Sequence, residues 1–497
     1  MNWVLTSCRA CSRSTKRASS LCARSIAAFA ATLTFSGATV MTSCTNDTSD
    51  NPTQEQAKKN RTEFIQHTRA MMKELAENLN FNSWIAANQT NMLFNMYVLN
   101  NPYFEKTVLS SFFQKAQQSI KPVEEGSELA QMGFKMFGTV DLTEFNYRFV
   151  MKTEGAGFDV EEADDFEVII NGVDPQTQTV VPGSGKVALS AGGDQRFKMV
   201  IPSRQQEGLA IVVIIPSEFR FAISNNFRGT WIDMYSGSFQ NQIDASAGTE
   251  FIKTSDSWRV SGTLKSDIGY NMPGQKIDQT TLNFSILSDK ENKKGGADLS
   301  WEQNGRKMFA LSLKESSDSA AGLYNLDLSK FTSASSIVDV LAAIWSGRSI
   351  DEAKLTLLDD LTTTFSVSDM AKVLELQHAN ASARRNYADQ KTIDQYTQQL
   401  NELVKAEMTC KGVNQTIPMR LVTTKFGVDW WSMPAFNFAD ENGYVSLVDL
   451  LDPESVTYGI NIVDHAAEPM QQSVIVVRQL IQYVQGLVRG YQNPQGK

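Results

Sequence analysis

Apolar residues recur every three or four positions near the N-terminus and again in the last third of the chain. In 64–79 and in 104–116 these residues fall on one face of a helix, and 393–404 repeats the pattern later. Pro102 separates the first two segments, because proline disfavours helical backbone in the residue before it. We therefore expect a helical N-terminal region and further helices after the middle of the chain.

From about residue 138 the apolar period changes to two, which predicts strands. The segment 209–215 is continuously apolar and is typical of a strand that is buried on both faces. Asn304-Gly305 joins two alternating segments and supplies the two positive φ angles of a type I′ hairpin. Short strands with short polar turns predict an antiparallel sheet, a sandwich or a half-barrel.

Ser-rich segments at 316–319 and 333–336 separate a mixed C-terminal third. There, 355–367 predicts a strand pair, Ser368 caps a helix that carries Met370, and three more strands are expected. These last strands are 421–426, 430–438 and 445–451. The fold class is therefore α+β: helices first, antiparallel β structure in the middle and mixed α/β structure last. We expect a leader at 1–43, a polar tether at 44–60 and domains at 61–330 and 331–497.

The N-terminal segment has the pattern of a signal peptide. Basic residues precede a mostly apolar run at 26–41, which is too short for a comfortable transmembrane helix but suits a signal-peptide core. Thr42-Ser43-Cys44 after this run resembles the lipobox of bacterial lipoproteins, with Met41 where that family most often has leucine. The resemblance implies cleavage before Cys44 and acylation of its sulfur. The alternative is an ordinary secreted protein with a chance cysteine.

A polar stretch containing Asp47 and Asp50 follows Cys44. It resembles the export signals of Bacteroidota-type surface lipoproteins, and no acidic residue directly follows the cysteine as an inner-membrane retention signal would. Acyl chains anchor a protein without spanning the bilayer. We therefore expect attachment to the outer membrane, facing either the cell surface or the periplasm.

Charge and cysteine content narrow the possible partners. The net charge is −9 although the leader is basic, so the mature chain is more acidic still and is a poor nucleic-acid binder. Composition, at 42% apolar and 20% charged residues, is that of a folded soluble protein. Once the leader is removed only Cys44 and Cys410 remain, so no internal disulfide is expected if Cys44 is acylated. Cys410 is interpreted as a buried small apolar residue.

Sequence motifs give little chemistry. The three histidines lie in separate segments without metal-ligand spacing, and no Gly-x-Ser-x-Gly motif is present, so we expect no metal, no cofactor and no catalytic residues. Trp430 and Trp431 are candidates for stacking on a sugar ring, although both being structural is the simpler interpretation. Asp318-Ser319-Ala320 is similar to the O-glycosylation sites of Bacteroidota, with Ser319 as the acceptor.

These patterns favour a non-enzymatic, lipid-anchored binding or scaffolding protein. Its sheet would bind a glycan, a lipid or a partner protein. The alternative is a hydrolase of surface polysaccharide, because two carboxylates suffice for that reaction and carboxylates are plentiful here.

Overall fold

The computed structural model describes residues 53–78, 101–174, 176–203, 206–244, 249–253, 256–266, 279–289, 291–315, 350–459 and 461–462. The described chain has both helices and sheet, as expected for the α+β class. It divides into two compact units. The first unit contains the described chain from residue 101 to Asn292, and the second contains helix α2 and the described chain from Lys293 onward.

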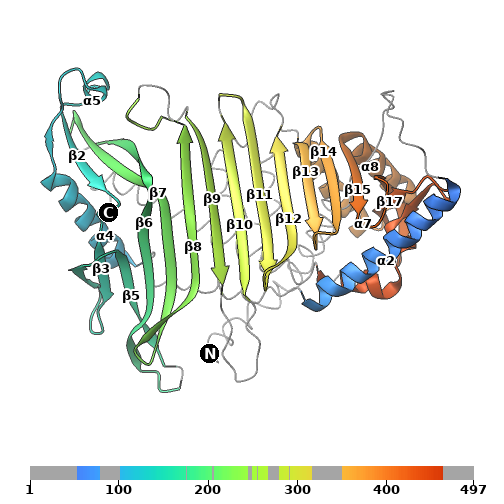
Figure 1. The fold of residues 1–497 in the computed structure, drawn as a ribbon, viewed down its shortest axis with the longest axis horizontal. Coiled ribbons are helices and arrows are strands. Elements are labelled where there is room, and N and C mark those ends of the chain that lie inside the picture. The colour runs from blue at the N-terminus through green and yellow to red at the C-terminus, as the bar shows by residue number, and fades with distance from the viewer. Residues whose placement is uncertain are drawn as a thin grey trace. The chain divides into compact units, whose positions relative to one another are not determined.

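The first unit is a mixed sheet built around two long strands (Figure 1). Its helices are α4 (Pro102–Gln118) and the short α5 (Glu128–Gln131). Its strands are β1 (Lys121–Pro122), β2 (Met136–Asp141), β3 (Tyr147–Met151), β4 (Phe158–Glu162), β5 (Phe166–Val173), β6 (Val180–Pro202), β7 (Leu209–Phe227), β8 (Thr230–Asp244), β9 (Ser257–Ser266) and β10 (Thr280–Asp289).

Most neighbouring strands of the first unit are antiparallel, but two pairs are parallel. β7 pairs with β6, β2 and β8, and the strands β8, β9 and β10 follow one another in chain order. β2 and β7 run parallel, as do β3 and β5. The expectation of an antiparallel sheet was therefore wrong at these two places. Parallel strands need a long connection between them, and the chain between β2 and β7 is long enough because it forms β3 to β6.

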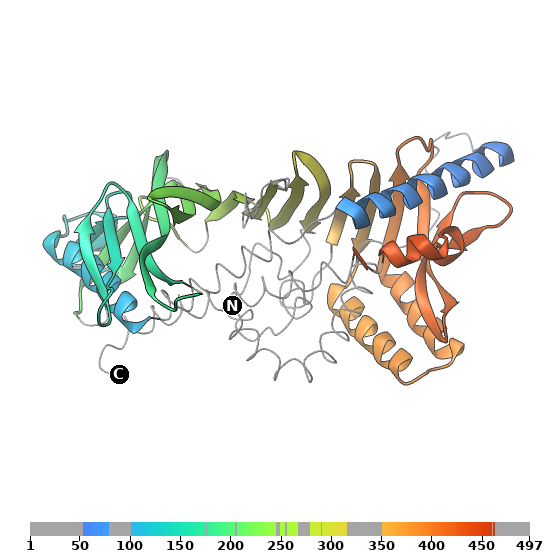
Figure 2. The ribbon, with the colours of Figure 1, turned by 90° about the horizontal axis from the view of Figure 1, so that it is seen from below.

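Helix α4 packs on the strands of this unit (Figure 2). Near its start, Phe104 lies against Phe149 and Phe158 in one apolar cluster. Near its end, Ala116 lies close to β2, where a Cβ on Gly138 would come within 2.4 Å of the Ala116 carbonyl oxygen. The amphipathic pattern of the helix thus determines which face it buries.

The second unit is an antiparallel meander with helices packed on it. Its strands are β11 (Lys294–Gln303), β12 (Arg306–Glu315), β13 (Ile350–Leu357), β14 (Leu361–Val367), β15 (Val404–Cys410), β16 (Ile417–Phe426), β17 (Asp429–Asn437) and β18 (Tyr444–Ser446). From β11 to β18 each strand pairs with the next one. Its helices are α2 (Gln54–Asn78), α7 (Met370–Arg385), α8 (Gln390–Leu403) and α9 (Leu447–Leu450).

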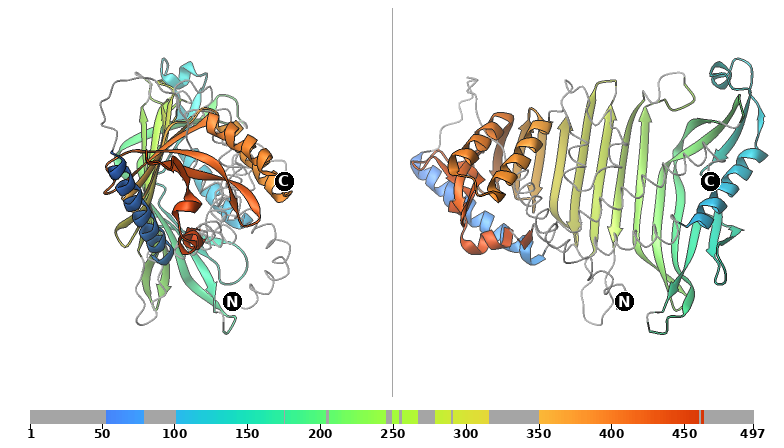
Figure 3. Two further views of the ribbon diagram at one scale, coloured as in Figure 1. Left: turned by 90° about the vertical axis from the view of Figure 1, so that its right-hand side faces the viewer. Right: turned by 180° about the vertical axis from the view of Figure 1, so that it is seen from behind.

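Helices α7 and α8 pack against each other, as Figure 3 shows, and cover part of this sheet. Met370 and Leu374 of α7 and Leu400 of α8 are buried with Phe365 of β14 in one core cluster. Asn401 fixes α8 to β16, because its side-chain amide donates to the Leu421 carbonyl at 2.8 Å and its Oδ1 accepts from the Leu421 N–H at 2.9 Å. Polar and apolar contacts therefore hold the helix pair on the sheet together.

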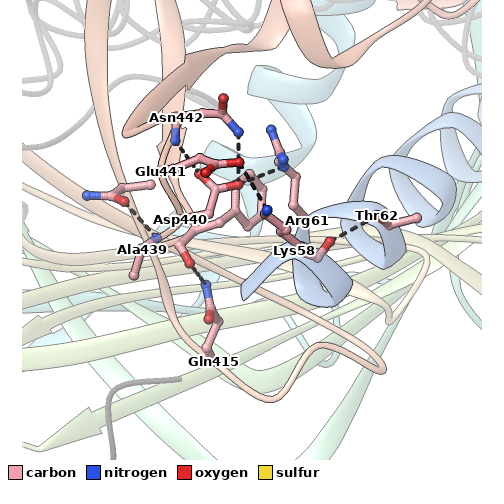
Figure 4. A network of polar contacts seen from close by, with 10 residues as sticks. Lys58, Arg61, Thr62, Gln415, Ala439, Asp440, Glu441 and Asn442 are labelled. Carbon is pink, nitrogen blue, oxygen red and sulfur yellow. Dashed lines mark hydrogen bonds and ion pairs between the residues drawn. The ribbon is translucent and has the colours of Figure 1, made fainter. Parts of the chain in front are cut away.

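Helix α2 joins the second unit although it precedes the whole first unit in the chain. Phe64, which is buried, has its ring centroid 5.0 Å from that of Phe436 and 5.3 Å from that of Phe438. Beside these rings, Arg61 Nε lies 2.9 Å from Asp440 Oδ2, and Lys58 pairs with Glu441 at 3.0 Å (Figure 4).

Several local predictions are confirmed, and others need correction. Asn304 and Gly305 have φ of 53° and 76°, as the type I′ hairpin requires. Residues 210–213 are all buried, as predicted for 209–215.

The cap of α7 is Asp369, not Ser368. The strand expected at 445–451 was wrong after Ser446, which caps α9 instead. No helix among the described residues has the length and apolarity needed to cross a membrane.

Candidate functional site

A bulge interrupts the longest strand pair of the first unit. The register of β6 and β7 shifts between Gly192 and Arg196, so residues 193–195 of β6 lie opposite Ser217 of β7. We call residues 193–195 the β6 bulge. Bulges bend a strand and redirect its side chains, and they occur often beside functional sites.

The sequence of the bulge explains its conformation. Gly193 has φ of +75°, and a Cβ at this position would lie 2.1 Å from Ser217 Oγ, so only glycine fits without a shift. Arg196 Nη1 donates to the carbonyl oxygen of Gly193 at 2.7 Å and to that of Gln195 at 3.0 Å. These bonds occupy backbone acceptors that the sheet leaves unpaired at the bulge.

The bulge forms one wall of a groove of about 450 Å³ over β6, β7, β8 and β9, which we call the polar groove. Apart from one glycine, the groove is lined by residues with polar side chains: Gly193, Asp194, Gln195, Ser217, Glu218, Gln240, Asn241, Gln242, Arg259 and Ser261. Amides, carboxylates, hydroxyls and a guanidinium together provide both hydrogen-bond donors and acceptors. Such a surface suits a ligand with many hydroxyl groups.

Strand register explains why Glu218, Gln240, Gln242, Arg259 and Ser261 of the groove share one face. Glu218 lies opposite Gln240, which lies opposite Ser261. Two residues further along β8, Gln242 lies opposite Arg259 of β9. Directly opposed residues point to the same face, as do residues two apart in one strand. The side chains of Gln240, Gln242 and Arg259 are exposed on that face.

Glu218 is held by a neighbouring cation. Arg220 Nε donates to Glu218 Oε1 at 2.7 Å, and Arg220 Nη2 donates to Glu218 Oε2 at 3.2 Å. The Glu218 side chain is 16% exposed, whereas that of Arg220 is 66% exposed. Both oxygens of this carboxylate therefore accept hydrogen bonds from one guanidinium, which fixes the position of the carboxylate in the groove wall.

The opposite face of the same strands is aromatic. Phe239 lies between Phe221 and Phe284, with ring centroids 5.5 and 5.8 Å away, and Tyr235 adjoins Phe221 at 5.7 Å. Burial raises the pKa of Tyr235 to about 12. A second hollow of about 300 Å³ is lined by residues that include Trp258. Each strand thus alternates between a polar face and an aromatic one.

The predicted tryptophan pair belongs to the second unit, whereas the residues of the polar groove belong to the first. Both Trp430 and Trp431 are half-buried in β17. The guanidinium of Arg384 lies 3.8 Å from the ring centroid of Trp431, and Lys425 Nζ lies 5.8 Å from that of Trp430. Burial lowers the pKa of Arg384 to about 10, and this effect outweighs the charge of Asp429, which raises the pKa. A cation thus lies over each ring, and sugar stacking there stays a prediction.

The other two predicted site residues, Cys44 and Ser319, lie outside the described residues. Their acylation and glycosylation stay predictions.

In the second unit, the fold brings together three side chains that are far apart in the sequence. His67 of α2, Asp360 of the β13–β14 turn and Cys410 of β15 have ligand atoms within 4.8 Å of one another. His67 Nδ1 is 3.2 Å from Asp360 Oδ2, and Cys410 Sγ is 3.8 Å from Asp360 Oδ1. We call these three residues the His–Asp–Cys cluster.

The geometry of the His–Asp–Cys cluster does not suit nucleophilic catalysis. Cys410 is 5% exposed, and burial, together with the charges of Asp360 and Glu63, raises the pKa of its thiol to about 12. A cysteine nucleophile is activated by an adjacent base such as histidine or by a lowered pKa. Here Asp360 lies between His67 and the thiol, so the order of the groups is wrong for that chemistry.

Comparisons with protein-family models, with curated proteins and with solved structures find no match to this chain. The candidate sites therefore depend on their geometry alone. Sequence reasoning missed the polar groove, although Gly192-Gly193-Asp194 within a strand pattern is a bulge signal and Gln240 and Gln242 alternate with less exposed residues. It also missed the convergence of His67 and Cys410, for which the sequence has no local signal.

Proposed function

We propose that the protein is a lipid-anchored, non-enzymatic glycan-binding protein of the bacterial outer membrane and that the polar groove binds the glycan. The anchor is Cys44, from the resemblance of the leader to a lipobox. The observation that carries the binding proposal is the groove itself, in which a bulge and four strands bring amide, carboxylate, hydroxyl and guanidinium groups to one face.

The chemistry of the groove matches an oligosaccharide better than a lipid or a nucleic acid. A sugar presents hydroxyl groups that both donate and accept, and Gln240 and Gln242 offer both functions at two-residue spacing. An acyl chain would leave these groups without partners, which is unfavourable. Asp194 and Glu218 in the groove would repel phosphates.

Catalysis is the weaker interpretation of the same groove. Hydrolysis of a glycoside requires one carboxyl group that carries a proton and a second that acts as base or nucleophile. Both oxygens of Glu218 are already occupied by hydrogen bonds from Arg220, which leaves this carboxyl group poorly placed to contact a glycosidic oxygen. We therefore propose binding without hydrolysis.

The test is a binding measurement with the chain from Thr45 onward. The protein is screened on an array of bacterial and host glycans, and the affinity for the best ligand is measured by calorimetry. Replacing both Gln240 and Gln242 by alanine removes several hydrogen bonds of about 0.5–1.5 kcal/mol each, so we expect affinity to fall by roughly tenfold or more. Gln114→Ala, an exposed position on α4, is the matched control and should bind as the wild type does.

Three results would contradict the proposal. The first is an array with no ligand, and the second is unchanged affinity in the double variant. The third is the appearance of new reducing ends during incubation with the bound glycan, because that would show hydrolysis. Normal circular dichroism of the double variant separates loss of binding from loss of folding.

A further inference from the structure

The His–Asp–Cys cluster combines three ligand types that transition metals prefer. An imidazole nitrogen, a carboxylate oxygen and a thiol sulfur converge from α2, from the β13–β14 turn and from the end of β15. A mixed nitrogen and sulfur set favours zinc and similar ions over calcium and magnesium, which prefer oxygen ligands alone.

The distances in the cluster suit one bound ion. Zinc bonds of 2.0–2.3 Å in tetrahedral geometry place the ligand atoms roughly 3.3–3.8 Å apart. His67 Nδ1 and Asp360 Oδ2 are 3.2 Å apart, and Cys410 Sγ and Asp360 Oδ1 are 3.8 Å apart. The ligand atoms of these three residues all lie within 4.8 Å of one another.

A candidate for a fourth ligand lies on the same helix, outside the three-residue group. Glu63 precedes His67 by one helical turn, so the two side chains lie on one face of α2. The charge of its carboxylate contributes to the raised pKa of the Cys410 thiol. Its other described contact is a pair with Lys59 at 3.8 Å, an exposed i,i+4 interaction that is worth little.

Backbone contacts already orient Asp360. The N–H of Lys411, the residue after Cys410, donates to Asp360 Oδ1 at 2.9 Å. This bond holds the carboxylate beside the thiol and leaves Oδ2 facing His67. Outer contacts of this kind fix the ligands of metal sites.

We propose that Glu63, His67, Asp360 and Cys410 form a structural zinc site in the second unit. The ion would join helix α2 to the β13–β14 turn and to strand β15. The thiol would lose its proton to solvent when the ion binds. The site is independent of the polar groove and of the proposed glycan binding.

The test uses the metal alone. The chain from Thr45 onward is treated with chelator, desalted and titrated with Zn²⁺ by calorimetry, and Co²⁺ is added in parallel as a spectroscopic probe. We expect one ion per chain, a thiolate-to-cobalt absorption band and an increase in the melting temperature with zinc.

Variants assign the ligands. Cys410→Ser and His67→Ala should each weaken zinc binding by about 100-fold or more, and Cys410→Ser should abolish the thiolate band. Glu63→Gln should weaken it by roughly tenfold. The matched control is His378→Ala, which removes an exposed histidine of α7. Cys410→Ser is nearly isosteric, so it keeps the test valid if His67→Ala folds poorly.

Two results would overturn the proposal. One is the absence of stoichiometric zinc binding by the chelator-treated protein. The other is zinc binding by the Cys410→Ser and His67→Ala variants that equals that of the wild type. Unchanged affinity in Glu63→Gln would overturn the assignment of the fourth ligand.

Discussion

Replacing Gly193 by alanine tests whether the β6 bulge depends on a residue without a side chain. Two effects are expected. The left-handed φ of +75° disfavours alanine by about 1 kcal/mol relative to glycine. In addition, the new Cβ would lie 2.1 Å from Ser217 Oγ, so the serine must leave its rotamer or the bulge must open. An unfavourable rotamer costs about 0.5–1.5 kcal/mol, so we expect a total loss of about 2 kcal/mol.

A double-mutant cycle separates the two effects. Ser217→Ala removes the clashing oxygen, and the next atoms near the new Cβ belong to Glu218 at 3.3 Å or more. In that background Gly193→Ala should cost only the backbone part, about 1 kcal/mol, which leaves a coupling of about 1 kcal/mol. Gly126→Ala is the control for φ, because Gly126 has φ of +79° and nothing within 4 Å of its added Cβ.

The measurement is urea unfolding of the chain from Thr45 onward. Tryptophan fluorescence and circular dichroism are both used to monitor it, so that separate transitions of the two units become visible. The reasoning would be refuted if Gly193→Ala cost no more than Gly126→Ala, or if Ser217→Ala gave no relief. Either result would mean that the contact at the bulge is not tight.

Two further predictions concern the anchor and the second unit. Cys44→Ala should release the protein from membranes into the soluble fraction, as detected by fractionation and immunoblotting; a variant that stayed bound would contradict the lipid anchor. Arg61→Ala should cost about 2–3 kcal/mol in urea unfolding, because it leaves the fully covered carboxylate of Asp440 with only the neighbouring amide groups as partners. Lys58→Ala removes an exposed ion pair nearby and should cost less than about 1 kcal/mol, so equal losses in the two variants would count against this reasoning.

Local features of the fold were predictable because they depend on neighbouring residues. Asn304 and Gly305 have the positive φ angles that their identity favours, and the helix α4 begins at Pro102, where the break in the pattern indicated. The cap of α7 was misplaced by one residue. Asp369 Oδ1 accepts from the Lys372 N–H, whereas the Ser368 hydroxyl donates to the Leu403 carbonyl, a partner that is distant in sequence.

The grouping of elements was not predictable from the pattern. We expected one domain at 61–330. Instead, α2 belongs to the second unit, where the ring of Phe64 packs against that of Phe436 in β17. An amphipathic helix shows which of its faces is buried but not which sheet buries it. The same limit applied to the parallel pairing of β2 and β7, because strand period alone does not give strand direction.

Site prediction from sequence succeeds when ligands share one element and fails when tertiary structure assembles them. The separation of His67 and Asp360 is 293 positions, and that of Asp360 and Cys410 is 50, so no ligand-spacing rule applies. No cysteine or second histidine lies near His67 in the sequence, so no ligand motif includes it. In the fold, the buried face of α2 places the histidine beside the turn, and β14 and β15 pair so that Leu361 lies opposite Cys410. The register of one strand pair and the docking of one helix therefore create the cluster, and both are properties of the core.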